Sequence, residues 1–432
     1  MKKTEPILQV ALDFMDLGRA ANIAKEAVDG GADWIEAGTP LIKSEGLDAV
    51  REFRRLFPGR RIVADMKVMD TGRFEIEAAA KAGASIVTVL GVADDATVKE
   101  AVDAARNLGC QVMVDLMGVE DNAARAKEVE TLGVDYVCVH LSIDAQMKGL
   151  NAISELDKVC RNVKIPVAVA GGINSETAAS AVAAGASIVI VGGAIAKAED
   201  ATKAASIIKK AMLSGKKVDT TLYKKYTDPL KAFRNVSTAN ISDAMHRSGQ
   251  MEGIREYSPG KIVGTAVTVR TYPGDWAKPV EAIDVAKEGD VIVVDAGGSG
   301  IAVWGELASQ SCITKKLAGV VIDGALRDLE DIKKIKFPAY AKHVTPTAGE
   351  PRGLGEINVP VKCGGVLVRP GDYVIADGDG IVVVPKERAV EVANRALDVM
   401  ERENRIRGEI KRGSTLSKVM ELKKWEKREG CV

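Results

Sequence analysis

The stretch KAGASIVTV (81–89) decides the fold of the first half of the chain, because it joins the end of one element to the start of the next. A glycine of the kind that ends helices leads directly into a run of β-branched residues, which is typical of a helix followed by a buried strand. The same pattern recurs as GGADWIE (30–36), TLGVDYVCV (131–139) and AAGASIVIV (183–191). This repetition predicts strands that alternate with helices along the chain.

Strand-like apolar runs occur eight times in this half, and amphipathic stretches separate them. The runs are LQVALD (8–13), WIEAG (34–38), RIVADM (61–66), SIVTVL (85–90), QVMVDL (111–116), YVCVHL (136–141), PVAVA (166–170) and SIVIVG (187–192). Eight repeats of about 25 residues, with strands that are apolar on both faces, favour a (β/α)8 TIM barrel over a doubly wound sheet.

The composition excludes several classes of partner. Lysine plus arginine and aspartate plus glutamate each number 60, so the net charge is zero and we expect no nucleic-acid partner. No apolar run approaches the roughly 18 residues of a membrane span, so we expect no membrane partner. The six cysteines are scattered without a C-x-x-C pair, and no signal peptide precedes Pro6. These features predict reduced thiols in a cytoplasmic protein.

Polar residues gather where the predicted strands end, and in a (β/α)8 barrel active sites lie at the carboxyl ends of the strands. Each acidic residue could instead cap a helix or lie in a solvated loop, but convergence of so many on one rim favours a site. Asp65 and Lys67 are expected on one strand face, since side chains alternate along a strand. The candidates are Asp13, Glu36, Asp65, Lys67, Asp70, Asp115 and His140, with Gly171, Gly172, Gly192 and Gly193 after the last two strands.

The types of these residues indicate a chemistry. Glu36 and Asp65, on neighbouring strands, offer the oxygen ligands that Mg²⁺ prefers. The glycine pairs would let the backbone approach a phosphate, although a tight turn is the alternative for each pair. His140 is the only histidine of this half and could move a proton near neutral pH, although a lone histidine is usually structural. Together with Lys67, these groups predict proton removal beside a ketone and a stabilised enediolate of a phosphorylated sugar.

Six motifs in order carry a family resemblance: LQVALD, IEAGTP, ADMKVMD, VHLSIDAQ, AVAGGI and VGGAI. They resemble the orotidine monophosphate decarboxylase superfamily, and within it most closely the 3-hexulose-6-phosphate synthases. The resemblance covers residues from about 7 to 212. It implies a lyase that adds the enediolate of ribulose 5-phosphate to formaldehyde, or cleaves the product in reverse.

The resemblance also implies a role for each matching residue. Glu36 and Asp65 would bind Mg²⁺. Lys67 would contact the enediolate, and His140 would be the base. Asp13 would help to orient the substrate.

A second reading within the same superfamily is a 3-keto-L-gulonate-6-phosphate decarboxylase. The pattern of that family has an arginine three residues after the strand-6 histidine and another after strand 8, where this chain has Ile143 and Gly193. It also has a glutamate at the end of strand 5, where this chain has Asp115. These departures favour the synthase.

The periodic pattern ends after the first half. From Leu213 to Leu230 the sequence loses periodicity and gains charge, which indicates a linker between domains. The predicted division is a barrel in residues 1–213, a linker in 214–230 and a second domain in 231–432.

The second domain is predicted to be α/β and richer in strands than the barrel. Strand-like runs such as KIVGTAVTVR and GIVVVP outnumber its helical stretches. The tail from Glu387 onward is charged and helical in pattern, and we expect a solvated helix there.

A second group of candidate site residues lies in this domain. A glycine-rich turn exposes N–H groups that could hold a carboxylate, Arg327 could grip the same group, and Asp328 could bind Mg²⁺ or Mn²⁺. A surface ion pair is the alternative for Arg327 and Asp328. The candidates are Gly297, Gly298, Ser299, Gly300, Glu306, Arg327, Asp328 and Asp331.

These residues resemble, across residues 231 to about 390, the family that joins the regulator of ribonuclease activity A to the 4-hydroxy-4-methyl-2-oxoglutarate aldolases. The resemblance implies a metal on Asp328 and an enolate stabilised by Arg327 and the turn. Glu306 stands in place of the usual aspartate, which leaves its proton transfer open. Asp331 favours an aldolase, while a regulatory, binding or assembly module is the alternative.

Both resemblances imply a homo-oligomer. In the barrel family Asp70 reaches into the active site of a second subunit, so a dimer is implied. Members of the second family form trimers. Dimeric barrels joined to trimeric second domains would give a hexamer.

Overall fold

The structure is a computed structural model that describes residues 5–422. The chain divides into two compact units. The first contains the residues up to Gln146, Leu150–Lys225 and the chain from Glu401 on. The second contains Met147–Gly149 and Tyr226–Met400.

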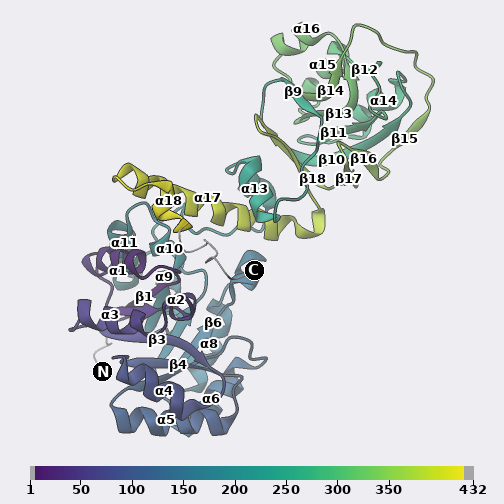
Figure 1. The fold of residues 1–432 in the computed structure, drawn as a ribbon. Helices are drawn as coiled ribbons and strands as arrows, with labels where there is room; N and C mark the ends of the chain where they lie inside the picture. The colour runs from purple at the N-terminus through teal and green to yellow at the C-terminus, as the bar shows by residue number, and fades with distance from the viewer. Residues whose placement is uncertain (1–4, 423–432) are drawn as a thin grey trace, which may run out of the picture. The chain divides into compact units, whose positions relative to one another are not determined.

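The first unit is a closed barrel of eight parallel strands in chain order, in which β8 pairs with β1 (Figure 1). The predicted (β/α)8 fold is confirmed, and each predicted strand lies within two residues of the observed bounds. The strands are β1 (Ile7–Leu12), β2 (Trp34–Ala37), β3 (Arg61–Val68), β4 (Ile86–Leu90), β5 (Gln111–Asp115), β6 (Tyr136–His140), β7 (Val167–Ala170) and β8 (Ile188–Val191).

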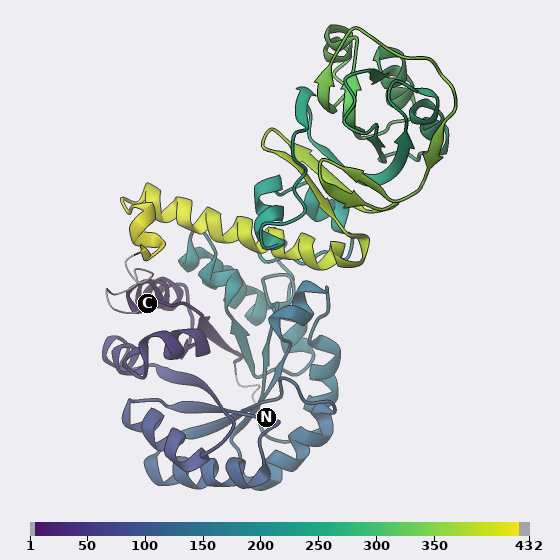
Figure 2. The same ribbon diagram turned by 45° about the vertical axis from the view of Figure 1, so that its right-hand side comes forward.

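Helices connect the strands and form an outer layer around them (Figure 2). They are α1 (Leu17–Asp29), α2 (Thr39–Glu45), α3 (Asp48–Leu56), α4 (Gly72–Lys81), α5 (Asp95–Leu108), α6 (Asn122–Leu132), α7 (Ile143–Met147), α8 (Ile153–Asn162), α9 (Ala178–Ala183), α10 (Gly193–Ala196) and α11 (Ala201–Ser214).

Two layers of apolar side chains explain why the strands are apolar on both faces. Side chains such as Trp34, Val63 and Met113 point into the barrel and form one buried cluster. Neighbours such as Ile35 and Ile62 belong to the larger cluster that includes the surrounding helices. Burial of both faces therefore fixes the strand positions in the sequence.

Strand β3 departs from regular geometry where its charged residues lie. Its pairing with β4 shifts register between Ala64 and Val68. Lys67 has a φ of 49°, a left-handed conformation that costs a non-glycine residue about 1–2 kcal/mol. Its N–H donates to Thr88 Oγ1 at 3.0 Å. The regular alternation of side chains along a strand therefore does not hold at Lys67. The Lys67 side chain nevertheless lines the same cavity as Asp65.

The second unit is built on a mixed nine-stranded sheet, which confirms the strand-rich α/β prediction. Its main path runs β19-β18-β10-β11-β13-β14-β9, with β12 beside β13, β15 beside β10, and a separate β16-β17 pair. The strands are β9 (Arg255–Ser258), β10 (Ile262–Thr271), β11 (Val291–Asp295), β12 (Ala302–Trp304), β13 (Gly319–Leu326), β14 (Ala339–Val344), β15 (Gly355–Ile357), β16 (Val361–Cys363), β17 (Val366–Val368), β18 (Tyr373–Asp377) and β19 (Gly380–Val384).

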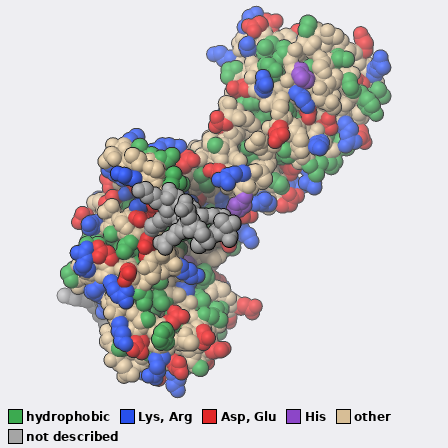
Figure 3. Space-filling view, in the orientation of Figure 1, with side chains coloured by type: hydrophobic (Ala, Val, Ile, Leu, Met, Phe, Trp, Pro, Cys, Tyr) green, Lys and Arg blue, Asp and Glu red, His purple; other side chains and the backbone are tan. Residues whose placement is uncertain are grey.

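Short helices accompany this sheet, and a long helix follows it. They are α12 (Pro229–Phe233), α13 (Thr238–Ala244), α14 (Ala277–Val285), α15 (Glu306–Thr314), α16 (Leu329–Lys334), the 3-10 turn η1 (Lys386–Arg388), α17 (Ala389–Lys411) and α18 (Leu416–Val419). No helix in residues 5–422 combines the length and apolar character needed to cross a membrane. Basic and acidic side chains are interspersed over the face seen in Figure 3.

The final part of α17 is not a solvated helix, so that expectation is wrong. Arg405 is 4% exposed and forms ion pairs with Glu26 of α1 at 2.9 Å and with Glu409 at 3.0 Å. Glu409 also accepts from Arg19 at 3.1 Å. The residues of α17 after Met400 thus belong to the barrel unit because buried charges hold them there.

Candidate active site

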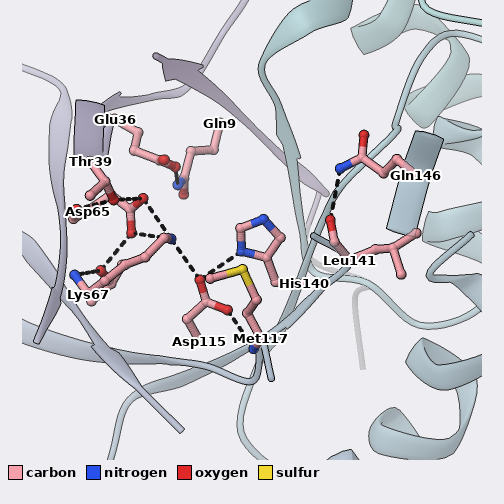
Figure 4. Close-up of polar contacts among 11 residues, drawn as sticks. Gln9, Glu36, Thr39, Asp65, Lys67, Asp115, Met117, His140, Leu141 and Gln146 are labelled. Atoms are coloured by element: carbon pink, nitrogen blue, oxygen red, sulfur yellow. Dashed lines mark hydrogen bonds and ion pairs between the residues drawn. The ribbon is translucent and has the colours of Figure 1, made fainter. Parts of the chain in front are cut away.

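The carboxyl ends of the barrel strands surround a cavity of about 350 Å³. Figure 4 shows its polar groups, which come from the strands and from the segments that follow them. The structure brings together these predicted residues around the cavity: Asp13, Glu36, Asp65, Lys67, His140, Gly171, Gly172, Gly192 and Gly193.

Lys67 and Asp65 form an ion pair inside this cavity. The Lys67 ammonium lies 2.8 Å and 3.0 Å from the two carboxylate oxygens of Asp65. The hydroxyls of Thr39 and Thr88 donate to the same carboxylate, each at 2.7 Å. Both oxygens of the Asp65 carboxylate thus accept hydrogen bonds. The charged residues of this apolar strand therefore pair with each other and with polar groups of neighbouring elements.

Asp115 joins the lysine to the histidine (Figure 4). Its Oδ2 lies 3.0 Å from Lys67 Nζ and 2.7 Å from His140 Nδ1, while its Oδ1 accepts from Met117 N at 2.9 Å. Burial opposes ionisation, but the hydrogen bond and charge of His140, with Lys67, lower the pKa of Asp115 to about 2. Burial also opposes the charge on Lys67, but Asp65 and Asp115 raise its pKa.

A proton on His140 Nδ1 follows from this contact. The ionised carboxylate of Asp115 can only accept, so the facing Nδ1 must donate. Nε2 of the neutral ring is then the unprotonated nitrogen and can act as a base.

Two further carboxylates, Glu36 and Asp13, line the cavity and feel the charge of Asp65. Burial, with the charges of Asp65 and Asp13, raises the pKa of Glu36 well above its usual value. Burial and the charge of Asp65 likewise raise the pKa of Asp13. Gln9 donates from Nε2 to Glu36, and its Oε1 is buried without a hydrogen-bond partner. A cation bound here would offset this repulsion.

This donor set fits a hard divalent cation, because it consists of carboxylate and amide oxygens. Within residues 5–422, no three or more His, Cys, Asp or Glu side chains are grouped closely enough to hold a metal by themselves. Glu36 and Asp65 would therefore hold Mg²⁺ together with water or substrate oxygens, which is the usual mode for this ion.

The glycine pairs lie at one end of the cavity, and one glycine of each pair has no room for a side chain. Gly171 and Gly172 have φ values of 101° and 74°. A Cβ on Gly171 would collide with the carbonyl of Leu141, and one on Gly193 would collide with the ring of Tyr223. Close approach of the backbone thus requires glycine at these positions.

Asp70 stands apart from this cavity. It is exposed, and its Oδ1 accepts from Thr71 N at 2.7 Å, just before α4. It does not line the cavity of its own chain. Its role toward a second subunit stays a prediction.

Several residues of the cavity had no predicted role. Asp115 was noticed at a strand end, but only the structure shows that it contacts both Lys67 and His140. Gln9 and Thr88 could have been found as polar residues inside apolar runs. Gln146 ends the VHLSIDAQ motif, but no role was predicted for it. Tyr223 gave no usable signal, since it comes from the stretch after α11.

In the second unit, three predicted residues meet at the end of β13. Asp328 Oδ2 lies 3.5 Å from Arg327 Nε and accepts from Glu306 N at 3.3 Å. Asp328 is the residue directly before α16, and its φ of 59° is left-handed. Arg327 and Asp328 are exposed.

The other predicted residues of this unit have different neighbours. The turn from Gly297 to Gly300 follows β11, and Gly298 packs beside Lys342 and Asp323, which pair at 3.2 Å. Asp331 is exposed and pairs with Lys334 at 2.7 Å.

Comparison with known proteins matches a family to each of the two domains. A model of the orotidine 5'-phosphate decarboxylase / HUMPS family matches residues 6–208, and an Aldolase/RraA model matches residues 238–383. The chain is similar to the 3-hexulose-6-phosphate synthase of Bacillus subtilis, with 43% identity over 48% of this chain and 99% of the relative. It is 42% identical to 3-hexulose-6-phosphate synthase 2 of Staphylococcus saprophyticus over 46% of this chain and 93% of the relative.

A crystal structure of 3-hexulose-6-phosphate synthase from Salmonella typhimurium is 37% identical, has a TM-score of 0.47, and covers 49% of this chain and 100% of that one. Since the B. subtilis relative is matched over nearly its whole length, the chain belongs, through its barrel, to the orotidine 5'-phosphate decarboxylase / HUMPS family, and it carries an RraA-like domain after that barrel.

Proposed function

We propose that the barrel is a Mg²⁺-dependent 3-hexulose-6-phosphate synthase, which joins D-ribulose 5-phosphate to formaldehyde or cleaves the product in reverse. The main support is the hydrogen-bonded set Asp65, Lys67, Asp115 and His140, which lines one cavity together with Glu36. The similarity to named synthases over their full length supports the same reaction. Proton transfer and anion stabilisation are what an enediolate reaction requires.

His140 would act as the base. Because His140 Nδ1 carries a proton and donates it to Asp115 in a hydrogen bond, Nε2 is free to take a proton from the carbon beside the substrate carbonyl. The imidazolium that forms is stabilised by the same carboxylate, whose lowered pKa keeps it charged. The enediolate carbon then attacks the carbon of formaldehyde, and the new alkoxide takes a proton from the imidazolium, which restores neutral His140.

Lys67 would stabilise the negative charge that develops on the enediolate oxygens. Its raised pKa keeps the ammonium charged throughout, and two carboxylates fix its position. Mg²⁺ held by Glu36 and Asp65 would polarise the carbonyl and add to this stabilisation. The glycines after β7 and β8 would offer backbone N–H groups to the phosphate.

The test is formaldehyde consumption by the purified full chain with Mg²⁺, with and without ribulose 5-phosphate. We expect consumption only when the sugar phosphate is present, and loss on addition of a chelator. Asp65→Asn should lower the rate by about 10²-fold or more, since it removes a charge held by three donors. Asp103→Asn, on the exposed face of α5, is the matched control. Equal rates for Asp65→Asn and wild type would reject the proposal.

The same protein can be offered 3-keto-L-gulonate 6-phosphate. Release of carbon dioxide at a rate above that of the synthase reaction would favour the decarboxylase. We expect the synthase to dominate.

For the second unit we propose a metal-dependent 2-oxo-acid aldolase, with a regulatory or assembly module as the alternative. The supporting observation is the ion pair of Arg327 and Asp328 after β13, with the Asp328 carboxylate accepting from the backbone N–H of Glu306. The test is pyruvate release from 4-hydroxy-4-methyl-2-oxoglutarate or oxaloacetate with Mg²⁺ or Mn²⁺. Loss in Asp328→Asn but not in the exposed control Glu330→Gln supports an aldolase, while no release by wild type supports the alternative.

We also propose that the chain assembles through both units, with Asp70 completing the site of a second barrel. A mass measurement in solution should give a dimer or a larger species such as a hexamer. A monomer that retains full activity would contradict this.

A further inference from the structure

The stretch after α11, here called the connector arm (residues 216–225), is packed against the barrel. Ser175 Oγ donates to the carbonyl of Val218 at 2.8 Å, and Val218 N donates to the carbonyl of Ser175 at 3.1 Å. Glu176 accepts from Thr220 N at 3.0 Å and pairs with Lys224 at 2.9 Å. The arm is thus held on the loop between β7 and α9, yet it lies beyond the residues that match the barrel family.

This arm places one aromatic side chain in the substrate cavity. Tyr223 is 8% exposed and lines the same cavity as Lys67 and His140. Its ring packs on Gly193, and its hydroxyl lies 3.3 Å from Oε1 of Gln146. Gln146 in turn donates to the carbonyl of Leu141 and lies beside Gly171 and Gly172. Tyr223 therefore contacts the end of the cavity where the glycine pairs meet.

Two ammonium groups flank this ring. Lys225 Nζ lies 4.2 Å and Lys197 Nζ 5.2 Å from the ring centroid, within the range of cation–π contacts. Lys197 lies directly after α10, the helix that begins at Gly193. Both ammonium groups therefore lie close to the ring that packs on Gly193, although neither lysine lines the cavity itself. Positive charge near the glycine end favours an anion there.

The backbone of Tyr223 is fixed from the far end of the chain. Its N–H donates to Oε1 of Glu401 at 2.6 Å, and Glu401 is 4% exposed. The carbonyl of Tyr223 accepts from Asn174 Nδ2 at 3.3 Å, on the β7–α9 loop. These two bonds hold Tyr223 in a left-handed conformation, with φ 54°.

We infer that Tyr223 forms the phosphate-end wall of the substrate cavity and sets the affinity for the sugar phosphate, and that Glu401 is a positioning residue acting through it. The inference rests on the proposed function. It means that the barrel site is completed by residues outside the eight β/α repeats. We infer that Tyr223 binds the substrate and the transition state equally well, so that its loss raises KM for the sugar phosphate and leaves kcat unchanged.

Kinetics of the full chain test this. Tyr223→Ala should raise KM for ribulose 5-phosphate by about tenfold or more, equivalent to about 1.4 kcal/mol, and leave KM for formaldehyde and kcat within about threefold. Tyr223→Phe keeps the ring and should give a smaller rise. Glu401→Ala should raise the same KM, and Glu401→Gln, which keeps an acceptor oxygen, should restore most of it. Tyr226→Phe is the control, because Tyr226 follows the arm and does not line the cavity.

Two outcomes would overturn the inference: an unchanged KM for the sugar phosphate in Tyr223→Ala, or equal rises in both KM values. Melting curves will show whether Tyr223→Ala folds. If it does not fold, the KM of Tyr223→Phe for ribulose 5-phosphate becomes the test of the inference. If wild type lacks synthase activity, the proposed function fails separately. In that case the inference is tested by calorimetry, which measures the binding of inorganic phosphate to wild type and to Tyr223→Ala. Weaker binding in the variant supports the inference, and equal or absent binding in both rejects it.

Discussion

The two units hold their charged groups in different ways. In the barrel, the side chains of Asp115 and Asp65 are 4% and 9% exposed, and each has several partners within 3.0 Å. In the second unit, Arg327 and Asp328 are 47% and 40% exposed and lie 3.5 Å apart. Buried, partnered charges must act as a set, because removing one leaves another uncompensated. Exposed charges can be changed one at a time at little cost.

The largest effect should come from His140→Ala. The variant removes the proposed base, and kcat for the synthase reaction should fall by about 10²–10⁴-fold. In the same assay Asp328→Asn should leave the rate unchanged, since it alters only the second unit. Rates of formaldehyde consumption by both variants provide the measurement. If Asp328→Asn lowers the synthase rate as much as His140→Ala, the two sites are not independent.

Asp115→Asn sharpens the contrast, because it keeps the shape of the side chain and removes its charge. Lys67 loses one of two carboxylate partners, and His140 loses the acceptor that fixes its proton on Nδ1. We expect kcat to fall by about 10²-fold, with little change in KM. Asp103→Asn is again the control. A rate within twofold of wild type would mean that Asp115 does not orient the base.

The next effect concerns stability. Arg405→Met removes the buried cation that pairs with Glu26 and Glu409, and should destabilise the barrel unit by about 2–4 kcal/mol. Arg407→Met, an exposed arginine of the same helix that pairs with Glu403, should cost less than about 0.5 kcal/mol. Denaturant unfolding followed by tryptophan fluorescence measures both. Equal values for the two variants would show that burial of Arg405 is unimportant.

The smallest effect is in the pH dependence of the same contact. Burial alone would raise the pKa of Glu26, but the hydrogen bond and charge of Arg405 lower it below its usual 4.5. A lowered pKa in the folded state stabilises the fold above the usual pKa, and this contribution is lost as pH falls through the lowered value. Glu26→Gln should therefore be less stable than wild type at neutral pH, with the difference shrinking in acid. A difference that stays constant with pH would contradict the ionic role.

The barrel and much of its site could be predicted because they depend on local patterns. Strands buried on both faces show as apolar runs, and the parallel barrel geometry then brings Glu36, Asp65 and His140 together. The left-handed Lys67 could not be predicted, because it depends on a hydrogen bond to Thr88 on another strand. Tyr223 could not be predicted either, since the arm has no periodicity and its position depends on Glu401.

The hydrogen bond between Tyr223 N–H and Glu401 joins residues that are synthesised at different times. The ribosome makes the barrel strands first, and residues 226–400 must follow before Glu401 emerges. At about 5–20 residues per second, that interval lasts on the order of 10–35 seconds. During it the nascent barrel can close, but the backbone of Tyr223 lacks its bond to Glu401. If Tyr223 sets the affinity for the sugar phosphate as inferred above, tight binding should begin only after Glu401 has been synthesised.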